Sequence, residues 1–112
     1  LAKMIGISRT KNIIMRGKRL SGEEAFQLGI ACEVVEKSEL ENMTKKIVKE
    51  LLGVSPLAQR TIKSVLNATQ NATLHTSIDL EGEAYGRLRS SNDFKEGVKS
   101  FSEKRPPSYK GN

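Results

Sequence analysis

The sequence has no tryptophan, one cysteine and one histidine, and its other aromatic residues are two tyrosines and three phenylalanines. A single cysteine, Cys32, excludes an internal disulfide and a cysteine-based zinc cluster, so we expect it to be a small buried hydrophobic residue. His75 stands without the further histidine or cysteine ligands that a zinc site needs. We therefore expect no metal site and no catalytic role for these two residues.

Long hydrophobic runs are also missing. The longest uncharged stretch, SVLNATQNATLHTSI at residues 64–78, is too short and too polar to span a bilayer, and no signal peptide opens the chain. With 112 residues, 37% hydrophobic and 29% charged, the composition is that of a helix-rich globular domain, or a piece of one. We expect a cytoplasmic protein without membrane contact.

No glycine-rich phosphate loop of the GxGxxG or Walker type occurs. Acidic residues cluster where helices are predicted to start (Glu23, Glu24, Glu39 and Glu41), and capping and the helix dipole account for them there. The net charge is +6, and residues 1–20 carry six Lys or Arg and no acid. This basic end is typical of a solvated face, but it also leaves open an anionic partner.

Start and stop signals predict a succession of helices. Ser8 is a candidate cap for a helix that ends at Gly17, and Ser21 with Glu24 fits a capping box for a helix that ends at Gly29. Further helices are predicted near 39–52, from Ser55-Pro56, around Leu74–Leu88, and from Ser91 or Asn92 to about Lys104. Pro106 and Pro107 prevent the last helix from continuing.

One segment, near residues 31–36, reads as a short strand because Val34 and Val35 are β-branched and the run is short. The last predicted helix places Phe101 and Lys104 three residues apart, hence on one face. An aromatic surface beside an ammonium group suits a ligand with an apolar part and a phosphate, although a phenylalanine at such a position is more often a core residue.

Three ordered blocks of the sequence resemble the enoyl-CoA hydratase/isomerase, or crotonase, superfamily, specifically the C-terminal part of its subunit. The blocks are GKRLSGEEAFQLGIACEVVEKSELE, SPLAQRTIKSVLNAT and LEGEAYGRLRSSNDFKEGVKSFSEKRPPSYKG. The resemblance implies a mainly α fold class, the C-terminal helical region of a crotonase-like subunit with one or two short strands. It also implies that residues 1–54 end the crotonase core and that residues 55–112 form a C-terminal oligomerisation and lid region.

The same resemblance implies a function. The parent subunit is expected to bind acyl-CoA thioesters and to hydrate 2-enoyl-CoA, a lyase reaction of fatty acid metabolism, through enolate stabilisation in an oxyanion hole. Its catalytic residues are expected upstream of Leu1, so the chain alone is predicted to be inactive. No covalently bound cofactor is expected, since coenzyme A thioester is the substrate.

By resemblance, Lys104 is a candidate contact of the phosphate-bearing end of coenzyme A. Phe101 and Tyr85 are candidates for the acyl pocket. The family's helices in this region build a trimer or a dimer of trimers, which makes a homo-oligomer the expected partner. The alternative from a different class is a free-standing helical module that binds nucleic acid through its basic N-terminal end.

Overall fold

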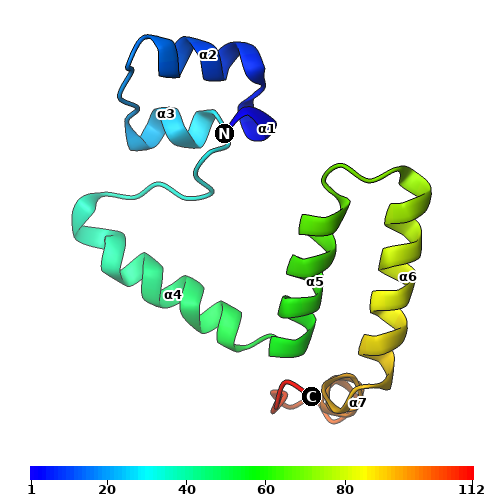
Figure 1. The fold of residues 1–112 in the computed structure, drawn as a ribbon. Helices are drawn as coiled ribbons and strands as arrows, with labels where there is room; N and C mark the ends of the chain where they lie inside the picture. The colour runs from blue at the N-terminus through cyan, green and yellow to red at the C-terminus, as the bar shows by residue number, and fades with distance from the viewer. The chain divides into compact units, whose positions relative to one another are not determined.

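The computed structural model describes residues 1–112, and every regular element in it is a helix (Figure 1). None of these helices has both the length and the apolar character needed to cross a membrane. In chain order they are α1 (Ala2–Ile5), α2 (Ile7–Met15), α3 (Gly22–Gln27), the 3₁₀-helix η1 (Lys37–Glu39), α4 (Leu40–Leu52), α5 (Pro56–Thr69), α6 (Leu74–Ser90) and α7 (Asn92–Ser102).

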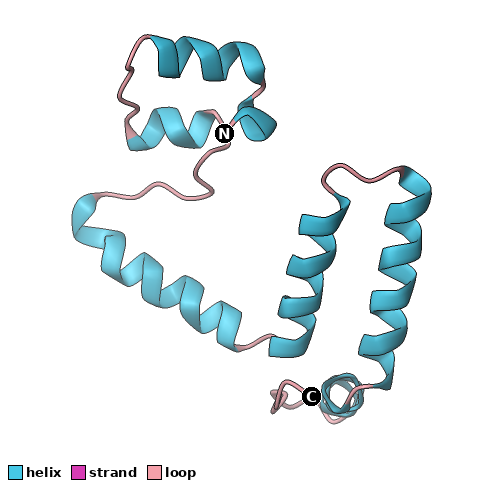
Figure 2. Cartoon of the chain, in the orientation of Figure 1, coloured by secondary structure: helices cyan, strands magenta, loops and turns pink.

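The predicted fold class, a helical crotonase region with one or two short strands, is wrong, because the chain contains no strand (Figure 2). Residues 31–36 instead form an extended loop between α3 and η1. A β-branched run becomes a strand only when a neighbouring strand accepts its backbone hydrogen bonds, and no second strand exists here. Val34 instead packs its side chain against Gly22 at the start of α3.

The chain divides into two compact units, residues 1–44 and residues 45–112, with the division inside α4. In the first unit, α1 contacts α2, and Ile5 and Thr10 are its buried residues. The capping box predicted at the start of α3 is confirmed. Ser21 Oγ accepts a hydrogen bond from the Glu24 backbone N–H at 3.1 Å, and Glu24 Oε2 accepts one from the Ser21 N–H at 2.9 Å.

In the first unit, helices α2 and α3 end in the same way. The residues after their caps, Gly17 and Gly29, have φ angles of 59° and 71°, in the left-handed region that glycine adopts without steric cost. The N–H groups that follow bond back to the last turns, from Lys18 to Ile13 at 3.0 Å and from Ile30 to Ala25 at 2.8 Å. These are Schellman motifs, so both predicted glycine stops are confirmed.

In the second unit, α5 packs along α6, and α6 contacts α7 (Figure 1). Each helix opens with a hydroxyl cap: Ser55 Oγ accepts from Ala58 N–H, Thr73 Oγ1 from Thr76 N–H, and Ser91 Oγ from Phe94 N–H. Pro56 occupies the first turn of α5, where its missing N–H costs no hydrogen bond. The caps predicted at Ser55 and Ser91 are therefore confirmed.

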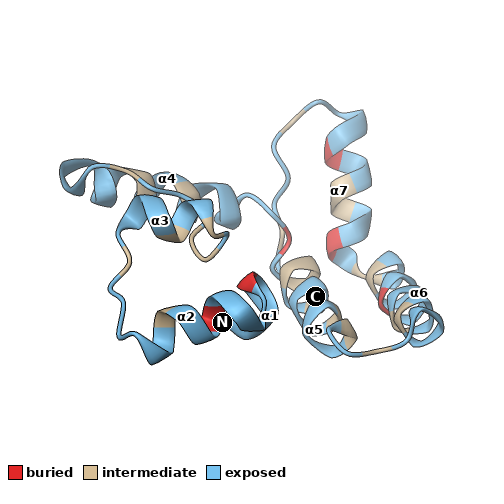
Figure 3. Cartoon of the chain, turned by 90° about the horizontal axis from the view of Figure 1, so that it is seen from above, coloured by how far each residue is buried: buried red, intermediate tan, exposed pale blue.

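Few side chains are buried, and most of those are polar (Figure 3). Ile5 and Ala84 are the buried hydrophobic residues, whereas Thr10, Ser55, Asp93 and Ser100 are the buried polar ones. Large apolar side chains on several helices stay exposed, among them Leu52 on α4, Leu66 on α5 and Ile78 on α6. The helix faces that amphipathic patterning would place in a core are thus largely uncovered within this chain.

Candidate functional site

Two of the three predicted site residues, Tyr85 and Phe101, line one groove in the second unit. This aromatic groove has a volume of about 510 Å³ and a largely apolar lining. Its walls come from α5, α6, α7 and the segment after α7, and its lining residues are Ser55, Ala58, Tyr85, Leu88, Ser91, Asp93, Phe94, Gly97, Val98, Phe101 and Tyr109. Lys104 is not among them.

Sequence reasoning missed two aromatic residues of this groove, Phe94 and Tyr109. Phe94 could have been found, because Phe94, Val98 and Phe101 follow one another at steps of four and three residues and so share one face of α7. No comparable signal marks Tyr109. It lies in a segment without regular structure, and only contacts between residues far apart in the sequence place it at the groove.

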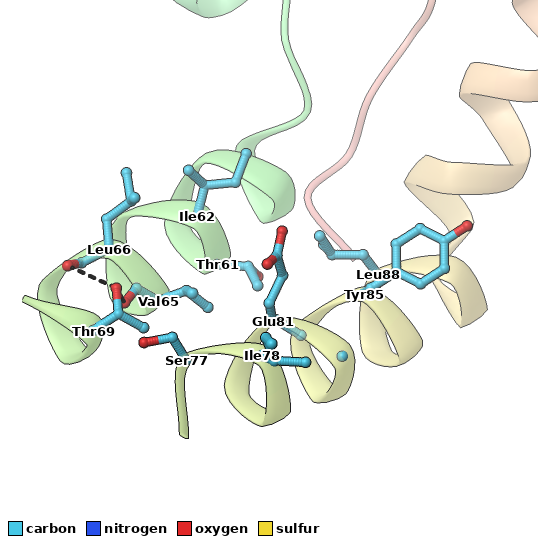
Figure 4. A pocket seen from close by; sticks show the side chains of 12 residues that line it. Thr61, Ile62, Val65, Leu66, Thr69, Ser77, Ile78, Glu81, Tyr85 and Leu88 are labelled. Carbon is cyan, nitrogen blue, oxygen red and sulfur yellow. Dashed lines mark hydrogen bonds between the residues drawn. The ribbon is translucent and has the colours of Figure 1, made fainter. Parts of the chain in front are cut away.

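A second groove, the hairpin groove, runs between α5 and α6 and has a volume of about 610 Å³ (Figure 4). Its walls include Ile62, Val65 and Leu66 from α5 and Ile78 from α6, with the carboxylate of Glu81 as its charged group. Tyr85 and Leu88 line both grooves, and the Tyr85 ring extends away from the hairpin (Figure 4). The two grooves therefore share one wall on α6.

Asp93, at the start of α7, is 4% exposed and is fully hydrogen-bonded. Its Oδ2 accepts from Ser55 Oγ at 2.5 Å, and its carboxylate also accepts from the N–H groups of Lys110 at 2.8 Å and Gly111 at 3.0 Å. Burial raises the pKa of Asp93, but these hydrogen bonds and the charge of Arg60 outweigh it, so the pKa is lowered overall. The side chain is thus an ionised anchor that joins the start of α5, the start of α7 and the end of the chain.

Glu96, one turn after Asp93, binds the guanidinium of Arg105 through two hydrogen bonds, from Nη1 at 2.6 Å and from Nη2 at 3.0 Å. It also accepts the Ser108 backbone N–H at 2.8 Å. The Arg105 hydrogen bonds, helped by that of Ser108, lower the pKa of Glu96 to about 2. Such a bidentate arginine–carboxylate pair fixes the orientation of the two side chains as well as the distance between them.

Lys104 follows the end of α7. It is the one non-glycine residue of the chain with a positive φ, 52°. The Lys104 N–H bonds to Phe101 O at 3.2 Å and the Arg105 N–H to Ser100 O at 3.1 Å, which makes a third Schellman motif. This motif explains how the helix turns directly into Pro106-Pro107. It also ties the backbone of Lys104 to that of Phe101, with a lysine where the other two motifs have glycine.

The other candidate residues lie elsewhere. Cys32 is exposed, so its expected burial is wrong: the loop that replaces the predicted strand leaves its side chain in solvent. His75, in the first turn of α6, has its Nδ1 3.0 Å from Asp79 Oδ2, and both side chains are exposed. The chain holds no group of three or more His, Cys, Asp or Glu side chains that could bind a metal ion.

A family model for enoyl-CoA hydratase/isomerase matches residues 1–112. The chain is 30% identical over 105 residues to a short-chain-enoyl-CoA hydratase of Clostridium acetobutylicum, covering 94% of this chain and 40% of that protein. It is 35% identical over 111 residues to a trans-2-decenoyl-[acyl-carrier-protein] isomerase of Streptococcus mutans, covering 99% of this chain and 42% of that protein.

Among solved structures, an enoyl-CoA hydratase from Bacillus anthracis superposes with a TM-score of 0.94 at 33% identity, covering 99% of this chain and 43% of that one. The chain therefore spans about two-fifths of the length of the relatives that it matches. These relatives include both a hydratase and an isomerase.

We predict that the stability of the chain falls in acid because Asp93 and Glu96 hold their protons more weakly when folded. A lowered folded pKa contributes stability above the unfolded value, 3.8 for Asp and 4.5 for Glu, and that contribution is lost as the pH falls through the folded pKa, about 2 for Glu96. The urea midpoint should drop between about pH 4.5 and pH 2, and less steeply in Glu96→Gln. An equally steep drop in Glu96→Gln would contradict this.

We predict that Lys104→Gly stabilises the chain by about 1 kcal/mol, because glycine removes the steric cost of the left-handed conformation. The matched control is Lys99→Gly, inside α7, which should destabilise by about 1 kcal/mol because glycine weakens a helix interior. Chemical denaturation followed by circular dichroism measures both. Destabilisation by Lys104→Gly would show that the left-handed conformation of Lys104 carries no steric cost.

Proposed function

Because the chain belongs to the enoyl-CoA hydratase/isomerase family, we propose that it forms part of the acyl-CoA-binding surface of a subunit that processes enoyl thioesters. The observation that carries this proposal is the aromatic groove, where Tyr85 and Phe101 lie on the same apolar lining. An apolar groove with few polar groups suits the hydrocarbon part of a thioester. Phe94 and Val98 extend the same surface along α7.

Lys104 is proposed to contact the phosphate-bearing end of coenzyme A. Lys104 stands at the end of α7, and its N–H donates to Phe101 O at 3.2 Å. This position supports the binding of a ligand whose apolar part lies in the groove and whose phosphate meets the Lys104 ammonium group. An ammonium group donates to phosphate oxygens as a flexible point charge, which tolerates several phosphate positions. Coenzyme A thioester would be bound as substrate, with no covalently attached cofactor.

The proposed reaction is hydration of a 2-enoyl-CoA. In that reaction, water adds across the double bond while preorganised N–H donors stabilise the enolate that develops on the thioester oxygen. We assign no catalytic residue to this chain and propose that the remaining three-fifths of the subunit supply the donors and the acid–base groups. The chain alone is accordingly proposed to be inactive.

Within that subunit, we propose that the chain is the C-terminal part, and that residues 55–112 serve in oligomerisation and cover the pocket. The exposed apolar faces of α5 and α6 support an assembly with further copies, a trimer or a dimer of trimers. A cytoplasmic location fits a chain whose single cysteine cannot form an internal disulfide. Membership of the enoyl-CoA hydratase/isomerase family gives no support for the alternative, a helical module that binds nucleic acid.

We predict that the chain self-associates, so that its mass by light scattering rises with concentration because apolar helix faces exclude water on contact. Leu66→Ser and Ile78→Ser, both in the hairpin groove, should shift the chain toward the monomer. Ser64→Ala on α5, outside that groove, is the control. A monomer at every concentration would contradict the oligomer.

We predict that Lys104→Ala, placed in the complete subunit, weakens binding of a coenzyme A thioester about tenfold, the equivalent of about 1.5 kcal/mol for one charge-assisted contact. Isothermal titration with crotonyl-CoA measures the affinity. Lys63 lies on α5, outside the lining of the aromatic groove. Lys63→Ala removes an equal charge there and should leave the affinity unchanged. Equal affinities of the two variants would overturn the assignment of Lys104.

A further inference from the structure

Residues 105–112, which we call the strap, have no helix or strand, yet hydrogen bonds hold them near both ends. At the near end, Glu96 binds the Arg105 guanidinium and the Ser108 N–H. Arg105 Nε also donates to Glu103 Oε2 at 2.6 Å. One carboxylate on α7 therefore receives both the side chain and the backbone of the first half of the strap.

At the far end, Asp93 accepts the N–H groups of Lys110 and Gly111, and the Asp93 N–H in turn donates to Asn112 O at 3.1 Å. From α5, Arg60 Nη2 donates to Gly111 O at 2.9 Å. The strap is thus bound as a protein binds an extended peptide, mainly through the peptide's backbone.

Between these two anchors, Tyr109 lies half-buried at the aromatic groove, opposite Gly97 of α7. A methyl group built on Gly97 would sit 3.3 Å from the Tyr109 hydroxyl oxygen, so the ring would have to shift by a few tenths of an ångström to admit it. Tyr109 is therefore the apolar contact of a segment whose other contacts are polar.

We propose that the strap is a detachable lid, which swings away as a unit while α5, α6 and α7 stay folded, and whose closure places Tyr109 on the aromatic groove. Pro106, Pro107, Ser108 and Lys110 are exposed, so opening uncovers little apolar surface besides Tyr109. Segments of this kind open at a small fraction of the global unfolding free energy.

The motion would hinge at the Lys104 turn, because Pro106 and Pro107 fix φ at two positions and restrict the residue before them, which keeps the start of the strap rigid. Opening would remove one wall from a groove whose other aromatic walls are Tyr85, Phe94 and Phe101. Access to the groove would change in this way whichever ligand the groove binds.

Amide hydrogen exchange on the 112-residue chain tests independent opening. The strap amides of Ser108, Lys110 and Gly111 should exchange at least about tenfold faster than the interior amides of α7. Glu96→Gln should accelerate the strap amides further without changing those of α5 and α6. Glu83→Gln, the same change on an exposed residue of α6, should have no effect.

Equal exchange of the strap and the α7 interior in the unsubstituted chain would overturn the proposal, because the strap would then open only by unfolding of the whole unit. Unchanged strap exchange in Glu96→Gln would overturn it as well. The unsubstituted chain decides the question even if a variant folds poorly.

Tyrosine fluorescence tests whether the lid closes the groove. The chain has two tyrosines and no tryptophan, so Tyr85→Phe leaves Tyr109 as the sole emitter. In that background, adding Glu96→Gln or Gly97→Ala should shift the acrylamide quenching of Tyr109 toward that of free tyrosine. Glu83→Gln and Gly86→Ala, whose added methyl group meets no atom within 4 Å, should not. Equal quenching in all four variants would overturn the role of Tyr109.

Discussion

The Asp93 carboxylate is the interaction on which the arrangement of the second unit depends. It is a nearly buried charge, and burial alone would drive it toward the neutral acid. Donors from Ser55 and from two successive backbone N–H groups, at Lys110 and Gly111, reverse that tendency. Because Ser55 also caps α5, the Asp93 side chain holds the start of α5, the start of α7 and the end of the chain together.

This polar anchoring contrasts with how little apolar surface the chain buries. Two hydrophobic residues, Ile5 and Ala84, are buried, whereas most large apolar side chains remain exposed. Local structure is therefore set by caps, Schellman turns and carboxylate contacts rather than by a central core. A share of about two-fifths of the relatives' length is consistent with apolar faces that need other surfaces to cover them.

The sequence predicted those features that depend on a few neighbouring residues. The caps at Ser21, Ser55 and Ser91 and the stops at Gly17 and Gly29 are all present, because each needs only residues within one turn. The cap proposed at Ser8 is wrong, since α2 begins one residue earlier, at Ile7, after Gly6. No side chain caps the start of α2, and the Thr10 hydroxyl instead donates to Gly6 O at 2.9 Å.

Features that depend on distant partners were not predictable in the same way. The prediction of a strand near residues 31–36 was wrong because a strand needs a neighbouring strand, which local propensity does not report. At the candidate site, the α7 spacing indicated Phe101 and could have indicated Phe94, whereas Tyr109 required contacts across the unit. Asp93 lies in the first turn of α7, and its contacts with Ser55 and Gly111 appear only in three dimensions.

The most direct measurement of the central claim is a carboxyl carbon-13 NMR titration of Asp93 and Glu96 in the intact chain. If these carboxylates hold the end of the chain against α5 and α7, both should titrate below their ordinary pKa values of 3.8 and 4.5, with Glu96 at about 2. Midpoints at or above 3.8 and 4.5 would show that the carboxylates are unpaired in solution, and the account would be wrong.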